Sequence, residues 1–337
     1  MNTSHNNFHP EALPDKNSIY NSIIVLGTTA SGKTSVAVRL AYNFGGEIIS
    51  ADSRQTYTGL DIGSGKDLDE YETNGVKIPY HLIDVADLRT REYNVFNYQQ
   101  DFYKAFGEIQ KRGKLPVIAG GTGMYIDSVV RNYDFAEVPE NPSLRAELES
   151  KTLEELASIL LELKPNLHNK SDLLIRERLI RAIEIARCMK SPAAESLRKN
   201  ANARPDIRPL ILGIKLERNI LRENIAIRLK ERLDAGMVEE VENLHKSGCS
   251  WEKLERLGLE YKFCSLYIKG DIASRDELFE RLNIAIRQFA KRQETWFRRM
   301  ERSGIKINWI PPFEDKQKRI NAALKEAAKY FAAENTF

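Results

Sequence analysis

Short apolar runs alternate with amphipathic segments along much of the sequence. Six short apolar runs lie at 22–26, 48–49, 81–85, 114–119, 210–217 and 307–311 and are interpreted as strands. After the first run, Val36, Ala37, Leu40 and Ala41 recur at the spacing of one helix face. Strands that alternate with helices predict a parallel sheet with right-handed crossovers. The expected fold class is therefore α/β.

The segment between Phe135 and Pro209 has a different pattern. It has no convincing strand, several prolines and strongly charged amphipathic stretches. Long helices are expected afterwards from Arg218 to Lys246 and from Arg275 to Arg302. The predicted organisation is a flexible leader at 1–20, a core at 21–134 and 207–313, a helical insertion at 135–206 and a C-terminal helix at 314–337.

The composition is typical of a soluble globular protein and excludes several classes. The 337 residues are 42% hydrophobic and 29% charged, and no apolar run approaches the ~20 residues that cross a bilayer. Cys188, Cys249 and Cys264 are too few and too unevenly spaced for a zinc module or a disulfide framework. The polar N-terminal stretch lacks the pattern of a signal peptide, so we expect a cytoplasmic protein without a membrane partner.

The first apolar run leads into a glycine-rich loop with the pattern G-x-x-x-x-G-K-[ST]. The motif consists of Gly27, Thr28, Thr29, Ala30, Ser31, Gly32, Lys33 and Thr34. Such a loop points backbone N–H groups at a phosphate, the lysine adds a positive charge, and Thr34 can hold Mg²⁺. The alternative is an ordinary turn with a chance lysine. The loop alone leaves open whether the γ-phosphoryl group of a nucleotide moves or a whole pyrophosphate departs.

Polar residues follow two other predicted strands at the edge where a parallel sheet binds ligands. Asp52, in "ISADSRQTYTGLDIGSGK", can act as a general base or can cap the turn that follows it. Thr122, in "AGGTGMYI", can contact a substrate or can belong to a tight turn without a ligand. Asp61, Ser64 and Lys66 are expected to shape the loop after Asp52 rather than to react.

Positive charge gathers in one late helical segment, "RQFAKRQETWFRRMERSG", at 287–304. Its cations suit a phosphate backbone and its aromatic residues suit unstacked bases, as in the recognition of single-stranded RNA loops. The alternative is a solvated helix with core aromatics, which we favour for Phe289 and Phe297. Arginines also occur in the insertion, where Arg181 can instead pair with Glu184. The net charge of +3 does not by itself indicate nucleic-acid binding.

The ordered motifs "GTTASGKT", "ISADSRQTYTGLDIGSGK", "PYHLIDV", "AGGTGMYI", "RERLIRAIEI" and "AKRQETWFR" resemble those of the tRNA dimethylallyltransferase (tRNA isopentenyltransferase) family over about 23–298. The resemblance implies a P-loop nucleoside-kinase-like parallel sheet with an all-helical insertion domain. It implies an enzyme that uses Mg²⁺ and transfers the dimethylallyl group of dimethylallyl pyrophosphate to tRNA. The acceptor is the N6 amine of the adenosine 3′-adjacent to the anticodon, and pyrophosphate is released.

The same resemblance assigns roles by matching position. Asp52 is the general base, Thr122 holds the flipped adenine, Arg228 assists the departure of pyrophosphate, and the glycine-rich loop with Lys33 binds pyrophosphate. The implied tRNA contacts are Asp52, Ser53, Arg54, Gln55, Thr122, Arg145, Glu177, Arg178, Leu179, Ile180, Arg181, Lys291, Arg292, Gln293, Trp296 and Arg298.

The sequence departs from the family pattern at three places. The proline usual after the first loop glycine is Thr28, and the family's Gly-Tyr followed by a basic residue appears as "GLEYK" at 258–262. No cysteine and histidine pair follows the core, so the zinc module of some eukaryotic relatives is absent and a bacterial-type enzyme is implied. We expect a monomer. The remaining alternatives are prenylation of free adenine nucleotides, a small-molecule kinase and a non-catalytic RNA-binding P-loop protein.

Overall fold

A computed structural model describes residues 19–90, 92–135, 138–165, 173, 175–191 and 204–331. The chain forms two compact units, one of Met1–Asn132 with Arg204–Phe337 and one of Tyr133–Ala203. The sequence pattern puts the boundaries of the insertion at 134/135 and 206/207, whereas the structure divides at 132/133 and 203/204. The predicted leader lies outside the described residues except for Ile19 and Tyr20.

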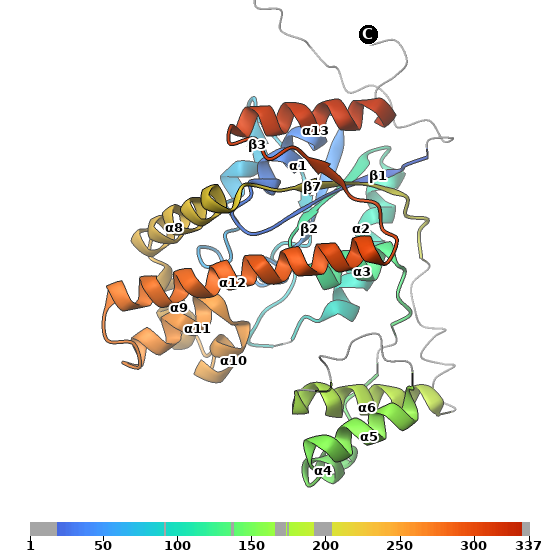
Figure 1. Cartoon of the computed structure of the whole chain (residues 1–337), viewed down its shortest axis with the longest axis vertical. Helices are drawn as coiled ribbons and strands as arrows, with labels where there is room; N and C mark the ends of the chain where they lie inside the picture. The colour runs from blue at the N-terminus through green and yellow to red at the C-terminus, as the bar shows by residue number, and fades with distance from the viewer. Residues whose placement is uncertain are drawn as a thin grey trace, which may run out of the picture. The chain divides into compact units, whose positions relative to one another are not determined.

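The larger unit is built on a six-stranded parallel sheet, as predicted (Figure 1). Its strands are β1 (Ser22–Gly27), β2 (Gly46–Ala51), β5 (Tyr80–His81), β6 (Leu115–Gly120), β7 (Pro209–Ile214) and β8 (Asn308–Ile310). Their order is β5-β2-β6-β1-β7-β8, so the strand that leads into the glycine-rich loop is central. A separate antiparallel hairpin consists of β3 (Glu72–Thr73) and β4 (Val76–Lys77).

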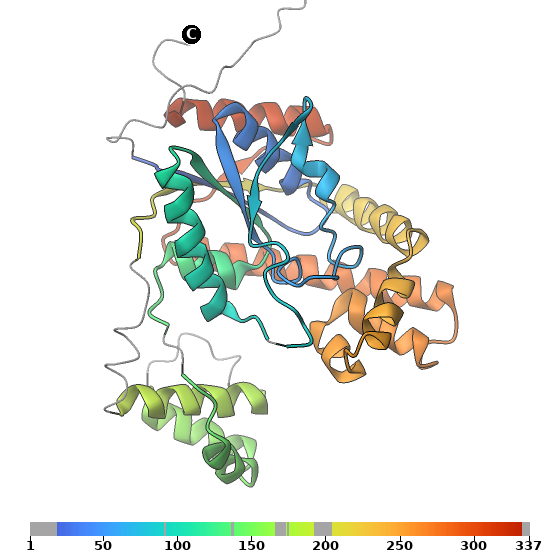
Figure 2. The ribbon, with the colours of Figure 1, turned by 180° about the vertical axis from the view of Figure 1, so that it is seen from behind.

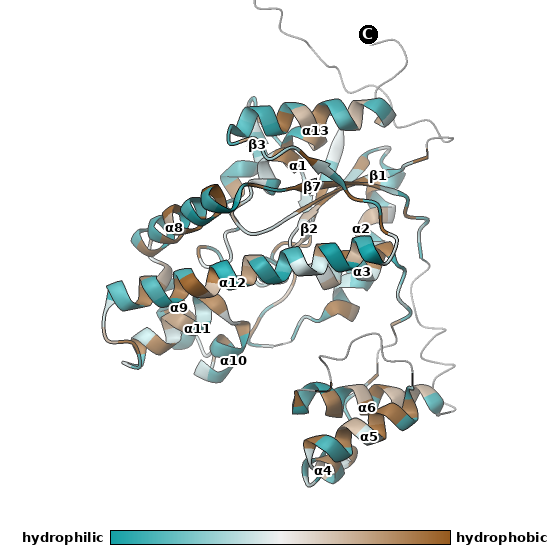
Figure 3. Ribbon diagram, in the orientation of Figure 1, coloured by the Kyte–Doolittle hydropathy of each residue, from teal (hydrophilic) through white to brown (hydrophobic). Residues whose placement is uncertain are grey.

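Helices cover both faces of this sheet, and successive residues of β1 contact opposite layers. Ile23 and Val25 pack in the layer of α1 (Lys33–Asn43) and α13 (Lys316–Phe331). Ile24 and Leu26 pack in the layer of α2 (Val95–Lys111), α3 (Gly123–Val130) and α12 (Arg275–Arg302). The view from behind shows α2 along its face of the sheet (Figure 2). Burial on both faces explains why β1 and β7 are continuous apolar runs, coloured as hydrophobic in Figure 3.

The predicted helix at 218–246 consists of two helices. The helices are α8 (Arg218–Asp234) and α9 (Met237–Lys246), which are separated at Gly236 with φ +100°. That left-handed conformation favours glycine and ends α8. Two further helices, α10 (Trp251–Leu257) and α11 (Leu259–Ile268), lie where no element is predicted. The predicted helix at 275–302 matches α12, and the C-terminal one corresponds to α13 within the described residues.

The prediction of a strand at 81–85 is wrong for most of its length. Only Tyr80–His81 pairs with β2, because Leu82 and Asp84 have φ of +62° and +56°. A left-handed backbone cannot continue a strand. The segment instead turns, and Asp84 forms an ion pair with Lys66. A short 3-10 helix, η1 (Leu68–Tyr71), follows Lys66.

The smaller unit is helical in its described part, which contains no strand. Its helices are α4 (Pro142–Glu149), α5 (Leu153–Leu163) and α6 (Arg176–Lys190). They bury a leucine-rich core that includes Leu148, Leu156 and Leu179. Asn141 caps α4, and Thr152 with Glu155 forms a reciprocal capping box on α5.

No helix in the described segments is both long enough and apolar enough to cross a membrane.

Candidate nucleotide and nucleic-acid site

The glycine-rich loop lies between the end of β1 and the start of α1. Ala30 and Gly32 have positive φ of 59° and 80°, so the chain curls between Gly27 and Lys33. A Cβ at Gly27 would lie 2.8 Å from the Ile214 carbonyl oxygen, which explains the need for glycine. The Ser31 hydroxyl donates to the Thr28 carbonyl at 2.8 Å and fixes the curl. This is the local geometry that the motif predicts.

A cavity of about 550 Å³ opens at this loop. The loop lines it through Gly32, Lys33 and Thr34, and one face of α8 lines it as well. Arg228 belongs to that face and its Nη2 atom lies 2.8 Å from Asp67 Oδ2. The structure therefore brings the predicted arginine to the predicted phosphate loop, although about two hundred residues separate them in sequence.

Lys33 lies within a strongly charged environment. Burial lowers its pKa from 10.5 to about 8, the negative charge of Asp52 opposes this effect, and the positive charge of Arg228 adds to it. The Nζ atom lies 3.4 Å from the Thr28 carbonyl oxygen. A bound polyanion would replace the lost hydration and favour the charged lysine.

Asp52 and Thr122 follow neighbouring strands, β2 and β6, and meet at the carboxyl edge of the sheet. The Ser53 N–H donates to Thr122 Oγ1 at 3.0 Å, and the Thr122 N–H donates to the Ala51 carbonyl at 3.1 Å. Asp52 Oδ1 accepts the Arg54 N–H at 3.0 Å, which is the turn cap that the sequence left open. A carboxylate has two oxygens, so the cap and a role as base are compatible.

The side chain of Gln293 connects two loops inside the protein and does not face solvent. This residue of α12 is only 7% exposed. Its Oε1 atom accepts the Thr29 N–H at 2.8 Å, and its Nε2 atom donates to the Gly121 carbonyl at 2.9 Å. The predicted tRNA contact of this residue stays a prediction, since the hydrogen bonds of its side chain are internal. The Thr29 amide is likewise engaged with Gln293 rather than directed at a phosphate.

The other residues of α12 with predicted tRNA contacts fall into two groups, one that packs on the protein and one that is exposed to solvent. Trp296 packs on the backbone at Gly123, where an added Cβ would overlap the indole ring. The predicted cations on this helix are exposed, namely Lys291, Arg292 and Arg298. Phe297 is buried in the core, as expected. The cationic surface of α12 thus consists of side chains that lie on its solvent side.

The residues after Asp52 also divide between surface and interior. Gln55 is buried, accepts the Ser50 hydroxyl at 2.9 Å and donates to the Gly65 carbonyl at 3.0 Å. Ser53 and Arg54 are partly exposed, and Arg54 Nη1 lies 3.4 Å from Ser53 Oγ. Only these two retain the exposure that the predicted tRNA contact requires.

The loop at 61–66 is held by buried charges. Lys66 is almost fully buried, lies 2.7 Å from Asp61 and donates to the Tyr57 carbonyl at 2.9 Å. Glu240 of α9 accepts three successive N–H groups at 3.0, 2.6 and 3.1 Å, those of Asp61, Ile62 and Gly63. The prediction that this loop has a structural role is confirmed. The sequence does not predict this role of Glu240, because the residue belongs to no local motif.

In the smaller unit, one buried glutamate pairs with two of the arginines for which the family resemblance implies tRNA contacts. Glu184 accepts the Asn141 N–H and pairs with Arg145 at 3.1 Å and with Arg181. Burial alone would raise the pKa of Glu184, but these bonds lower it below its ordinary value. The ion-pair alternative for Arg181 is thereby confirmed, and Arg145 shares it.

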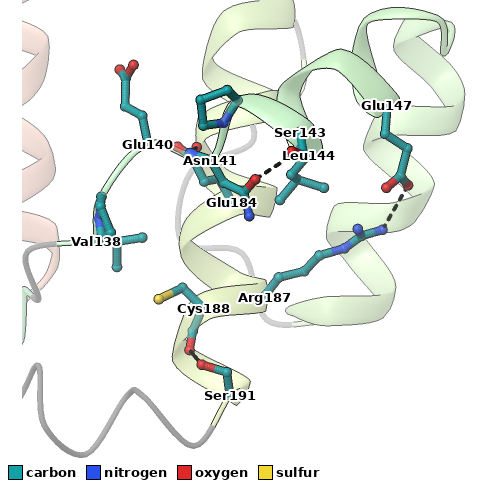
Figure 4. A pocket seen from close by; sticks show the side chains of 12 residues that line it. Val138, Glu140, Asn141, Ser143, Leu144, Glu147, Glu184, Arg187, Cys188 and Ser191 are labelled. Atoms are coloured by element: carbon teal, nitrogen blue, oxygen red, sulfur yellow. Dashed lines mark hydrogen bonds and ion pairs between the residues drawn. The ribbon is translucent and has the colours of Figure 1, made fainter.

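The remaining predicted contacts of this unit lie in α6. The side chains of Leu179 and Ile180 are buried in the unit's own core, and the predicted tRNA contacts of these two residues stay predictions. Glu177 and Arg178 are exposed. Neither residue lines the hollow of about 720 Å³ in this unit, which lies among Val138–Leu144, Glu147, Glu184 and Ser191 and includes the Arg187–Glu147 pair at 3.5 Å (Figure 4).

Comparison with known proteins decides the family. The model of the family described as "IPP transferase" matches residues 55–300, and the model described as "Isopentenyl transferase" matches residues 20–81. The chain is 58% identical to "tRNA dimethylallyltransferase 2" of Treponema denticola over 89% of this chain and 97% of that protein. The chain belongs to the tRNA dimethylallyltransferase family. A second family member, "tRNA dimethylallyltransferase 1" of Syntrophus aciditrophicus, is 53% identical over 86% of this chain and 93% of that protein.

Solved structures of the family have the same fold. The tRNA isopentenylpyrophosphate transferase of Bacillus halodurans aligns with a TM-score of 0.61 and 28% identity, over 92% of this chain and 98% of that chain. A eukaryotic dimethylallyltransferase acting on tRNA aligns with a TM-score of 0.65 at 20% identity, over 86% of this chain and 74% of that chain, and supports the fold alone. The P-loop core expected from the resemblance is thus confirmed at the level of the family.

The Gln293 bridge gives a first testable prediction for this family member. We expect Gln293→Met to raise the KM for the donor about tenfold. The Thr29 amide would lose its buried acceptor, which would destabilise the donor-binding conformation of the glycine-rich loop by about 1–3 kcal/mol. Affinity for tRNA should change little. The comparison is Arg292→Ala, an exposed neighbour, for which tRNA affinity should fall with a reduced salt slope and donor KM should stay constant. The reverse pattern would show that Gln293 contacts tRNA.

Proposed function

We propose that this protein transfers the dimethylallyl group of dimethylallyl pyrophosphate to the N6 amine of the adenosine 3′-adjacent to the anticodon in tRNA. The observation that carries the proposal is the cavity that Lys33 and Arg228 both line. Asp52 is close enough to act electrostatically on Lys33. The names of the relatives that are 53% and 58% identical support the same activity.

The cationic cavity suits the donor half of this reaction. Lys33 and Arg228 would bind the diphosphate with the N–H groups of the loop other than that of Thr29. As the bond between C1 and the bridging oxygen breaks, its electron pair goes to pyrophosphate. Cations that are already in place stabilise this new charge without reorganisation, which is the larger part of such catalysis.

The carboxylate at the end of β2 suits the acceptor half. The N6 lone pair forms the new bond to C1, and Asp52 accepts the N6 proton as the positive charge develops on nitrogen. Adenine N6 is a weak nucleophile because its lone pair is delocalised, so alignment of the amine matters as much as its deprotonation. Thr122, hydrogen-bonded to the residue after Asp52, would hold the purine beside that carboxylate.

The residues around Thr34 suit Mg²⁺. The described residues contain no group of three or more side chains arranged as a closed metal site. Mg²⁺ prefers one or two protein oxygens together with water and phosphate oxygens. The Thr34 hydroxyl lines the cavity together with the carboxylates of Asp67 and Glu70. Bound there with the diphosphate, Mg²⁺ would neutralise part of its charge.

The tRNA-binding surface would include the exposed cations of α12, Lys291, Arg292 and Arg298. The target base must leave its stack to reach Asp52, which costs a few kcal/mol that contacts with the anticodon loop must offset. We propose that the enzyme acts as a monomer. We also place the reaction in the cytoplasm.

The test is to incubate the protein with tRNA, dimethylallyl pyrophosphate and Mg²⁺, digest the tRNA and determine the masses of the nucleosides. We expect one adenosine per tRNA to carry a dimethylallyl group. AMP in place of tRNA tests the free-nucleotide alternative, and γ-labelled ATP in place of the donor tests the kinase alternative. Binding of tRNA without a modified nucleoside would support the non-catalytic alternative and contradict the proposal.

A further inference from the structure

A second arginine reaches the same cavity from the next turn of α8. Arg232 follows Arg228 by four residues, so the two side chains lie on one face of the helix. Both line the cavity with Lys33. A Cβ at Gly65 would overlap the guanidinium groups of both arginines, which shows that the two groups crowd the same point.

The positive charge of Arg232 is poorly compensated within the described residues. The side chain is only 12% exposed, and its Nε atom is buried without a hydrogen-bond partner there. Its polar contacts there are long, with Nη1 3.4 Å from the Gly63 carbonyl and 3.7 Å from Glu260, and Nη2 4.0 Å from Asp67. Arg228 instead holds the same Asp67 carboxylate at 2.8 Å.

The pKa shifts of the cavity cations agree with this crowding of positive charge. Burial lowers the pKa of Arg232, and the neighbouring charge of Arg228 lowers it further. The two arginines also lower the pKa of Lys33. Like charges that crowd a desolvated cavity disfavour the ligand-free state, and a bound polyanion would remove that cost.

Arg232 also lies close to Glu260, which belongs to the segment "GLEYK" that departs from the family pattern. The side chain of Glu260 is 12% exposed, belongs to the first turn of α11 and lies 3.7 Å from Arg232 Nη1. Burial raises the pKa of Glu260, whereas the charge of Arg232 opposes that rise. A carboxylate at this distance orients the guanidinium while leaving most of its donors unused.

We propose that Arg232 is a second arginine that binds the diphosphate in the donor cavity, oriented by Glu260. The inference rests on the proposed function and goes beyond it, because it assigns a ligand contact to a residue outside the matched motifs. A planar guanidinium presents five donors and suits phosphate oxygens better than a point charge does. With Arg228 and Lys33 it would surround the diphosphate with three cations from two walls.

The test is calorimetric titration of the full chain with inorganic pyrophosphate and Mg²⁺. For Arg232→Met we expect the Kd for pyrophosphate to rise about tenfold or more, with tRNA affinity unchanged. The matched control is Lys230→Met, which removes an exposed cation from the same helix and should change this Kd less than about twofold. An unchanged Kd in Arg232→Met would overturn the proposal and leave Arg232 as a support for the loop at 63–65.

Arg232→Lys serves if the methionine variant does not fold. Lysine keeps the charge but loses the planar set of donors, so we expect the Kd for pyrophosphate to rise about threefold or more. Equal affinity in this variant and the wild type would overturn the proposal. Nucleoside masses from the wild-type preparation separate the two claims, since absence of the modified adenosine contradicts the proposed function and a pyrophosphate Kd that ignores Arg232 contradicts this inference alone.

Discussion

Asp52→Asn is expected to lower kcat by about 10²–10⁴-fold, the range typical of a lost general base. Asparagine keeps a side-chain oxygen that can accept the Arg54 N–H, so the turn after β2 should survive. Affinity for tRNA should therefore stay within about twofold of the wild type. The measurement is single-turnover transfer at saturating tRNA and donor, together with tRNA binding by filter retention.

Asp52→Ala distinguishes a role of Asp52 as general base from its role as the cap of the turn after β2. Alanine removes both the proton acceptor and the oxygen that caps the turn, so its loss of kcat should equal that of Asp52→Asn if proton transfer dominates. If Asp52 serves only as a cap, Asp52→Asn should retain full turnover while Asp52→Ala loses it. That second pattern would remove Asp52 from the chemical step.

Lys33→Met is expected to lower kcat/KM for the donor by about 10²–10³-fold, because a preorganised cation at the departing diphosphate would be lost. The pKa of about 8 gives this prediction a pH dependence. Lys33 carries its charge below that pH and loses it above, so kcat/KM of the free wild-type enzyme should fall as the pH rises through about 8. The measurement is the pH profile of kcat/KM at low donor concentration.

Lys33→Arg provides the control for this profile. Arginine stays charged throughout the accessible range, so the alkaline fall should disappear even if overall activity is reduced. A variant that keeps the same fall would show that another group causes it. An undiminished kcat/KM in Lys33→Met would contradict the assignment of the loop to the donor diphosphate.

The elements that the sequence predicts well are those with long, regular patterns. β1 and β7 are apolar throughout because helices cover both faces, and α12 was predicted to the residue because its 28 residues keep one apolar face. The run at 81–85 also contains three apolar residues, yet its backbone turns at Leu82 and Asp84, and Asp84 forms an ion pair with Lys66. Local hydrophobicity does not record such contacts.

The candidate site was predictable where a contiguous motif carries it, at 27–34, Asp52 and Thr122. The motif does not say which side chains within a segment face outward. Gln293 and Leu179 both lie in matched segments, and helical geometry turns them into the interior. Arg232 and Glu240 were missed because their roles depend on loops far away in the sequence. Only the folded chain brings those loops to them.

The central claim is that the glycine-rich loop binds the diphosphate of an allylic donor and releases it intact. The most direct test follows the phosphorus during one turnover with dimethylallyl pyrophosphate labelled in its β-phosphate, in the presence of tRNA and Mg²⁺. The account predicts one labelled pyrophosphate for each dimethylallylated adenosine and no label in the tRNA. Label in the tRNA, or in inorganic phosphate without a modified adenosine, would contradict it.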